Sequence, residues 1–205
     1  MNVTVLAASG AVGLALTRQA LDRGYTVTAI ARTPARITVP DSPRLIRVAA
    51  DVRDPDGIAE ALSDSEIVLS GLGVAKGDKP GALAAGAHAV IDSHPGRIIW
   101  LGAYGTGPSS QAAGFATRTL LKAMGAELAD KVTGDAAVLE AGGTVFHCGP
   151  FSNGPVSATR RTVGLDETPK RFFPARVSRE TVAAAMLDEA RTPRFPGRVA
   201  VPLER

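Results

Sequence analysis

The sequence is poor in residues on which several protein classes depend. It has one cysteine, Cys148, which excludes an internal disulfide and a zinc site built from a cysteine cluster. With only three histidines besides, we expect no metal site. Aromatic residues are few, no run of lysine and arginine occurs, and the formal net charge is only +3. We therefore expect no nucleic-acid partner.

Long hydrophobic stretches are also missing. No apolar run reaches the roughly 18 residues that span a bilayer. The first residues look like a strand and do not show the charged region and cleavage site of a secretion signal. We therefore expect a cytoplasmic protein without a membrane partner. A length of 205 residues suits one hydrophobic core, so we expect a single domain over 1–205.

Short β-branched runs alternate with stretches of helical periodicity along most of the chain. Gly24 is a helix-stop signal, while Asp54-Pro55 and Ser178 are helix-start signals. This alternation predicts one α/β domain with a doubly wound parallel sheet, a Rossmann fold. The predicted strands are 3–6, 25–30, 44–49, 66–70, 97–101, 144–147 and 198–201, and the predicted helices are 11–23, 56–62, 82–92, 112–141 and 178–190.

Two segments break this rhythm. The helical stretch 112–141 contains Gly125 and Gly134, and we expect a break near one of them. Residues 151–177 are rich in proline and loop-like, and we expect them to form the rim on the substrate side.

The turn between the first predicted strand and helix contains two glycines, Gly10 and Gly13, in the order Ala7-x-x-Gly10-x-x-Gly13. A strand, a glycine-rich turn and a helix N-terminus together favour binding of a diphosphate. Gly10 is expected where backbone meets phosphate, and Gly13 where the helix packs on the strand. A tight turn without a ligand is the alternative. The predicted contacts in this turn are Ala7, Ser9, Gly10, Ala11, Val12 and Gly13.

Residues at the ends of the next predicted strands indicate which dinucleotide would bind. Arg32, with Arg36 nearby, stands where an NAD-binding domain often has an acid, and it would pair with a 2′-phosphate. We therefore favour NADP(H) over NAD(H), although a solvated loop arginine would show the same pattern. Asp51 and Val52 are expected beside the adenine, or as a plain turn. The fourth strand ends in Gly71-Leu72-Gly73, where the small glycines would leave room for a ribose, or would form a plain strand-ending turn.

Taken together, these motifs resemble the atypical short-chain dehydrogenase/reductases that bind NAD(P)H, in particular the NmrA-like and biliverdin/flavin reductase-like proteins. The resemblance covers nearly the whole chain and is carried by LAASGAVGLALTRQALDRGYTVTAIART, AADVRD, IVLSGLG, RIIWLGAYGTG, TVFHCGPFSNGP and VSRETVAAAMLDEA. Three positions depart from the family pattern. Ala7 replaces its first glycine, Gly102 replaces a Ser or Thr, and His147-Cys148 replaces an Arg-Pro pair.

The resemblance implies a reaction at the carboxyl ends of the strands, with Gly102, Ala103 and Pro150 beside the nicotinamide. The Tyr-x-x-x-Lys pair of a ketone reductase is absent, since neither Tyr25 nor Tyr104 has a lysine four residues on. The candidate catalytic residues are Tyr104 as proton donor, assisted by Lys131 or Lys122. The alternative is that Tyr104 is a packed loop aromatic and Lys131 a solvated helix lysine.

Three functions remain open from the sequence. A flavin, quinone or similar flat acceptor takes hydride without a strong protein acid, so a reductase of such a small molecule is our first hypothesis. The second is a non-catalytic NADP(H) sensor of the NmrA type that binds a partner protein. The third, a sugar-nucleotide epimerase, is disfavoured by the missing tyrosine–lysine pair and the short C-terminal part. We expect a monomer or homodimer.

Overall fold

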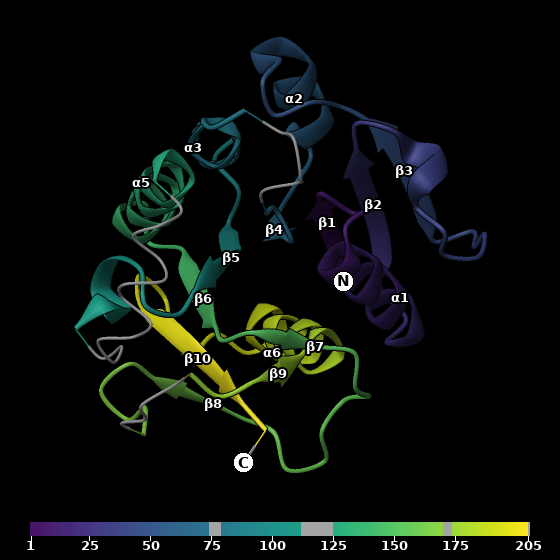
Figure 1. The fold of residues 1–205 in the computed structure, drawn as a ribbon. Coiled ribbons are helices and arrows are strands. Elements are labelled where there is room, and N and C mark those ends of the chain that lie inside the picture. Colours follow the sequence, from purple (N-terminus) through teal and green to yellow (C-terminus); the bar gives the residue numbers. More distant parts are fainter. Residues whose placement is uncertain (74–78, 112–124, 170–173, 205) are drawn as a thin grey trace.

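The computed structural model describes residues 1–73, 79–111, 125–169 and 174–204, in which strands and helices alternate (Figure 1). The strands are β1 (Asn2–Leu6), β2 (Thr26–Ala31), β3 (Leu45–Ala49), β4 (Ile67–Ser70), β5 (Arg97–Ala103), β6 (Thr144–Cys148), β7 (Phe151–Ser152), β8 (Arg161–Gly164), β9 (Val177–Ser178) and β10 (Val199–Leu203). The helices are α1 (Ala11–Asp22), α2 (Pro55–Leu62), α3 (Ala82–Asp92), α5 (Ala126–Glu140) and α6 (Arg179–Arg191), with short 3₁₀ turns η1 (Pro34–Arg36) and η2 (Gly107–Ser110).

Eight of the strands form one sheet in the order β3-β2-β1-β4-β5-β6-β10-β8. All neighbours in it are parallel except β8, which pairs antiparallel with β10. The chain winds outward from β1 to β3 and then returns to the other side of β1 with β4. This is the doubly wound α/β sheet that the sequence predicted, and its switch point lies between β1 and β4.

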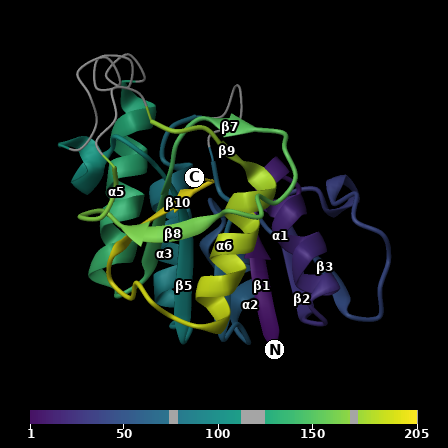
Figure 2. The same ribbon diagram turned by 90° about the horizontal axis from the view of Figure 1, so that it is seen from below.

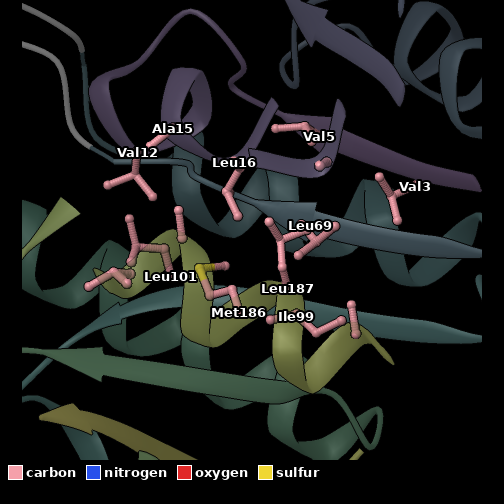
Figure 3. Packing of buried hydrophobic residues seen from close by; sticks show 14 of the residues in the cluster. Val3, Val5, Val12, Ala15, Leu16, Leu69, Ile99, Leu101, Met186 and Leu187 are labelled. Atoms are coloured by element: carbon pink, nitrogen blue, oxygen red, sulfur yellow. The ribbon is translucent and has the colours of Figure 1, made fainter. Parts of the chain in front are cut away.

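Helices cover both faces of the sheet (Figure 2). Helices α1 and α6 pack on each other and on one face, while α2, α3 and α5 cover the other. Figure 3 shows the core between the sheet and the α1–α6 pair, where Leu16 of α1 and Met186 and Leu187 of α6 meet Leu69 and Ile99 of the strands. Burial of both faces explains why the central strands are almost continuously hydrophobic.

The predicted helix boundaries follow local chemistry. Asp54 and Ser178 cap α2 and α6 by accepting hydrogen bonds from the backbone of Gly57 and Thr181. Gly24 has φ +79° just beyond α1, a conformation that favours glycine and ends the helix. These three signals are confirmed. No helix in the described ranges is long and apolar enough to cross a membrane.

The two glycines of the predicted helix 112–141 have different places in the structure. Gly125 directly precedes α5, while residues 112–124, predicted as helical, lie outside the described residues. A break at Gly134 is wrong, because α5 runs through it. A Cβ on Gly134 would stand 3.0 Å from the carbonyl oxygen of Leu83, so this glycine lets α5 approach α3 closely.

The structure also extends the strands beyond their predicted limits. Gly102 and Ala103, which follow the predicted strand 97–101, belong to β5 and pair with His147 and Cys148 of β6. The loop-like segment 151–177 contains three short strands. Two of them, β7 and β9, form a parallel pair, and β8 becomes an edge of the main sheet. These strands went unpredicted because they are short and depend on distant partners.

Candidate functional site

A cavity of about 370 Å³ opens at the carboxyl ends of the central strands, at the switch point between β1 and β4. This is where a doubly wound sheet binds its ligands. Residues from both halves of the chain line it: Leu6, Ala7, Ser9, Gly10, Ala11, Val12, Ile30, Ala31, Arg32, Arg36, Ala50, Asp51, Val52, Arg53, Gly71, Leu72, Gly73, Ala82, Leu101, Phe151 and Arg179.

The turn from β1 into α1 forms the floor of this cavity. Gly10 is the N-cap residue of α1, and its N–H donates to the carbonyl oxygen of Ala7 over 2.9 Å. No described side chain caps α1, and its first turn contains no acid. Ala11 and Val12 line the cavity, so the partial positive charge of the helix end faces it. Such an end is suited to bind a diphosphate.

Gly13 has a packing role and does not line the cavity. A Cβ at this position would stand 2.2 Å from the carbonyl oxygen of Ala7 and 2.7 Å from Cα of Ala8. Gly71, which directly follows β4, packs against Gly13 in turn. A Cβ added at Gly71 would lie 3.0 Å from the backbone nitrogen of Gly13. Glycine at both positions therefore lets α1 and β4 close on the end of β1.

One end of the cavity, beyond β2 and β3, is rich in arginine. Arg32 follows β2, Arg36 ends η1, and Arg53 follows β3. Arg53 also binds the carbonyl oxygens of Lys79 and Pro80, which ties this end to the chain before α3. The only acid in the cavity's described lining is Asp51, whose Oδ1 accepts from the backbone N–H of Arg53 over 3.0 Å. The lining is therefore strongly cationic, as an anionic ligand requires.

The other end is formed by Leu101 at β5, Phe151 of β7 and Arg179 at the start of α6. Gly102, Ala103 and Pro150, which were expected beside the nicotinamide, are adjacent to Leu101 and Phe151 in the chain but do not line the cavity. Arg179 was missed from the sequence, where Ser178-Arg179-Glu180 indicates only a helix start.

The chain matches the model of the NAD(P)H-binding family over residues 7–193. It belongs to the NAD(P)H-binding family. The match spans the glycine turn, every parallel strand except β1 and β10, and all five described helices. No curated protein matches the chain.

Solved structures agree with this family on the fold. A short-chain dehydrogenase/reductase from Veillonella parvula, in complex with NADP, has a TM-score of 0.80 at 18% identity over 98% of this chain and 93% of that one. ChuY, an anaerobilin reductase from Escherichia coli O157:H7, has a TM-score of 0.78 at 18% identity, covering 100% and 97%. SP1627 from Streptococcus pneumoniae, assigned as an NADH-flavin reductase, has a TM-score of 0.76 at 19% identity over both full chains.

In this NAD(P)H-binding chain, the two candidate catalytic residues lie outside the cavity lining. The backbone N–H of Tyr104 donates to the carbonyl oxygen of Cys148, and its ring packs on the cluster around β8 and β10. Burial raises the pKa of the Tyr104 phenol. Nζ of Lys131 donates to the carbonyl oxygen of Leu101 over 3.1 Å and lies 3.8 Å from Asp135. The third candidate, Lys122, lies outside the described residues.

Behind β5 and β6, a buried polar cluster connects two of the departures from the family pattern. Nδ1 of His147 lies 2.6 Å from Oγ of Ser109, and Nε2 lies 3.5 Å from the carboxylate of Asp135. A Cβ on Gly102 would stand 2.6 Å from the His147 ring and 3.1 Å from Asp135. Gly102 is therefore small because His147 occupies the space of a side chain there.

The thiol of Cys148 lies beside the same cluster and is buried. Burial raises its pKa far above the ordinary value, and Asp135 adds to this while Lys131 opposes it. The thiol is therefore protonated at neutral pH and is a poor nucleophile. Cys148 thus acts as a small buried hydrophobic residue.

Proposed function

We propose that this protein is an NADPH-dependent oxidoreductase that passes hydride to a flat acceptor such as a flavin or a quinone. The observation that supports this most is one cavity with two different ends. The uncapped start of α1 and the arginines after β2 form a cationic end, while Leu101 and Phe151 give the opposite end an apolar wall beside a single arginine, Arg179. The first suits a dinucleotide phosphate, and the second suits a conjugated ring.

The residues present fit the dinucleotide. The backbone at Ser9, Gly10 and Ala11 would hold the diphosphate at the mouth of α1, with Ala7 and Val12 beside it. Asp51 and Val52 would border the adenine, and Gly71, Leu72 and Gly73 the ribose on the nicotinamide side. We propose that Arg32 reads a 2′-phosphate, with Arg36 in support, which favours NADP(H) over NAD(H).

Reduced nicotinamide supplies the hydride when the cofactor is bound. The chain's own contribution is to orient the two rings and to exclude water with Leu101 and Phe151. Lys131 fixes the backbone at Leu101 through its hydrogen bond to the carbonyl oxygen. Gly102, Ala103 and Pro150 would shape the same end from behind the lining residues. Proton donation by Tyr104, assisted by Lys131, stays a prediction that the Tyr104→Phe variant tests.

The test is NADPH oxidation, followed as the loss of absorbance of the reduced nicotinamide, with a panel of flavins and quinones. We expect turnover with at least one acceptor and a lower KM for NADPH than for NADH. Tight NADPH binding without turnover of any acceptor would contradict a reductase. It would favour the alternative, a non-catalytic NADP(H) sensor, which should also distinguish oxidised from reduced cofactor.

A further inference from the structure

Two short strands bring Phe151 and Arg179 to the same end of the cavity. Phe151 pairs with Val177, and Ser152 pairs with Ser178, in the parallel β7–β9 sheet. Arg179 follows β9 directly as the first residue of α6, and both it and Phe151 line the cavity. This register is fixed by backbone hydrogen bonding and by the Ser178 cap, so the two side chains are held in place by the fold.

The guanidinium of Arg179 is held in position by neutral groups. Its Nη1 donates to the carbonyl oxygen of Ser152 over 3.3 Å and to Oδ1 of Asn153 over 2.5 Å. Its Cζ lies 5.3 Å from the centroid of the Phe151 ring, in cation–π range. Both hydrogen bonds use one nitrogen, which leaves the rest of the planar fork for another acceptor.

Carboxylates near Arg179 in the chain are engaged elsewhere. Glu180 pairs with Arg18 and accepts from Gln19 on α1. Asp188 pairs with Arg23 and Arg160. Within the described ranges, no acid forms an ion pair with Arg179. Arg18, Arg23 and Arg160 are thus neutralised by protein carboxylates, whereas Arg179 lines a cavity.

We infer that Phe151 and Arg179 form an anion-reading subsite for the acceptor, and that the acceptor is a flavin carrying a phosphate. The assignment rests on the reductase function proposed above. A guanidinium binds phosphate through two parallel N–H···O bonds, and an aromatic ring gives a flat ring system a surface to stack on. A neutral flavin or a simple quinone would use the ring alone.

The position of the subsite argues that this phosphate belongs to the acceptor and not to the cofactor. Arg32 follows β2, whereas Leu101, which lines the cavity together with Phe151 and Arg179, lies on β5, three strands away in the sheet. At the usual spacing between strands this separation is about 14 Å. The cofactor's 2′-phosphate would lie at the β2 end. The cofactor's diphosphate is the other possible source of an anion here, so the experiment must separate the two.

Binding can be measured independently of turnover. Flavin fluorescence is titrated with protein saturated with NADP⁺, using flavin mononucleotide and riboflavin, which share a ring and differ by the phosphate. We expect the wild type to prefer the mononucleotide. Arg179→Gln should weaken mononucleotide binding about tenfold or more and leave riboflavin nearly unchanged, because a charge-assisted contact is lost. Arg179→Lys should lie between the two.

Arg176→Gln is the matched control, since it removes the same charge three residues away from an exposed side chain that does not line the cavity. It should leave the preference intact. NADP⁺ affinity, measured by calorimetry, should be the same in all variants. A preserved affinity also shows that each variant is folded.

Several results would overturn the subsite. One is that the wild type does not bind the mononucleotide, or binds both flavins with equal affinity. Another is that Arg179→Gln weakens the binding of both flavins equally. Weaker NADP⁺ binding by Arg179→Gln would assign the arginine to the cofactor's diphosphate and overturn it too. Failure of the proposed function looks different. The mononucleotide would still bind through Arg179, but NADPH would not be oxidised.

Discussion

Two helices begin at the same edge of the sheet and border the same cavity, yet only one has a free N-terminal end. Helix α1 follows β1, and α3 reaches the cavity through Ala82. Each has a glycine as N-cap residue, Gly10 or Gly81, and no acid in its own first turn. At α3, however, the carboxylate of Asp130 on α5 accepts from the backbone N–H groups of Leu83 and Ala84 over 3.1 and 2.9 Å.

The difference shows that a helix N-terminus becomes a ligand site only when the rest of the fold leaves it open. Asp130 is buried and supplies α3 with the negative charge that its first turn lacks. No described side chain does this for α1, where the cavity provides space for an external anion. Four substitutions test this contrast.

Asp130→Ala should have the largest effect, on stability. It leaves two backbone N–H groups of α3 without their acceptor in a buried place, which should lower the free energy of unfolding by about 2–4 kcal/mol. Asp130→Asn keeps one good acceptor and should cost less. Chemical denaturation gives both values. NADPH affinity should be nearly unchanged, and a large loss of affinity at full stability would mean that the α3 end serves the ligand.

Arg32→Ala should act on binding and leave stability almost unchanged, because the side chain is exposed. Loss of one charge-assisted phosphate contact should weaken NADPH binding by about 1.5–3 kcal/mol. NADH, which lacks the 2′-phosphate, should bind nearly as before. Calorimetry with both cofactors measures this. Arg36→Ala should weaken NADPH binding in the same direction but less, and Arg176→Gln, at an exposed arginine outside the cavity lining, is the control. Equal weakening of the two cofactors would show that Arg32 does not read the phosphate.

The open end of α1 could be predicted from sequence, whereas the filled end of α3 could not. Ala7 to Gly13 lie between a β-branched run and a helical pattern, so strand, turn and helix are all encoded within about a dozen residues. Asp130 is 47 residues from Leu83, and nothing local indicates that α5 will lie beside α3. Gly134 illustrates the same limit, since it suggests a helix break until the carbonyl of Leu83 is seen against it.

The two ends of the cavity show the same difference between local and long-range information in the sequence. Arg32 follows a predicted strand, so its place at the carboxyl edge is known in advance. Arg179 reaches the cavity only because β7 and β9 pair, and both strands have two residues. Likewise, Gly102 and His147 look like two separate departures from the family pattern. The register between β5 and β6 makes them partners across the sheet.

Ala11→Asp makes α1 resemble α3 by placing a carboxylate in its first turn. The free energy of unfolding should rise by about 0.3–1 kcal/mol, because a negative charge is favourable at a helix N-terminus. NADPH binding should weaken by about 1–2 kcal/mol, because the new charge repels the diphosphate. Ala11→Asn is the uncharged control of similar size. Calorimetry measures the NADPH affinity, and denaturation measures the free energy of unfolding. Unchanged NADPH affinity would show that the diphosphate binds elsewhere.

Ala7→Gly should have the smallest effect, and its sign is the informative part. Ala7 adopts a left-handed φ of +58° three residues before Gly10, the N-cap residue of α1, whereas at α3 the left-handed residue is the N-cap itself, Gly81, with φ +100°. An alanine in this conformation is strained by about 1–2 kcal/mol, and the freedom of glycine in the unfolded chain offsets part of that. The free energy of unfolding should therefore rise by about 0.5–1 kcal/mol with NADPH affinity unchanged. Ala8→Gly is the control: φ of Ala8 is not positive, so this substitution should only lower the free energy of unfolding. A fall in the free energy of unfolding for Ala7→Gly would show that the turn tolerates alanine without strain.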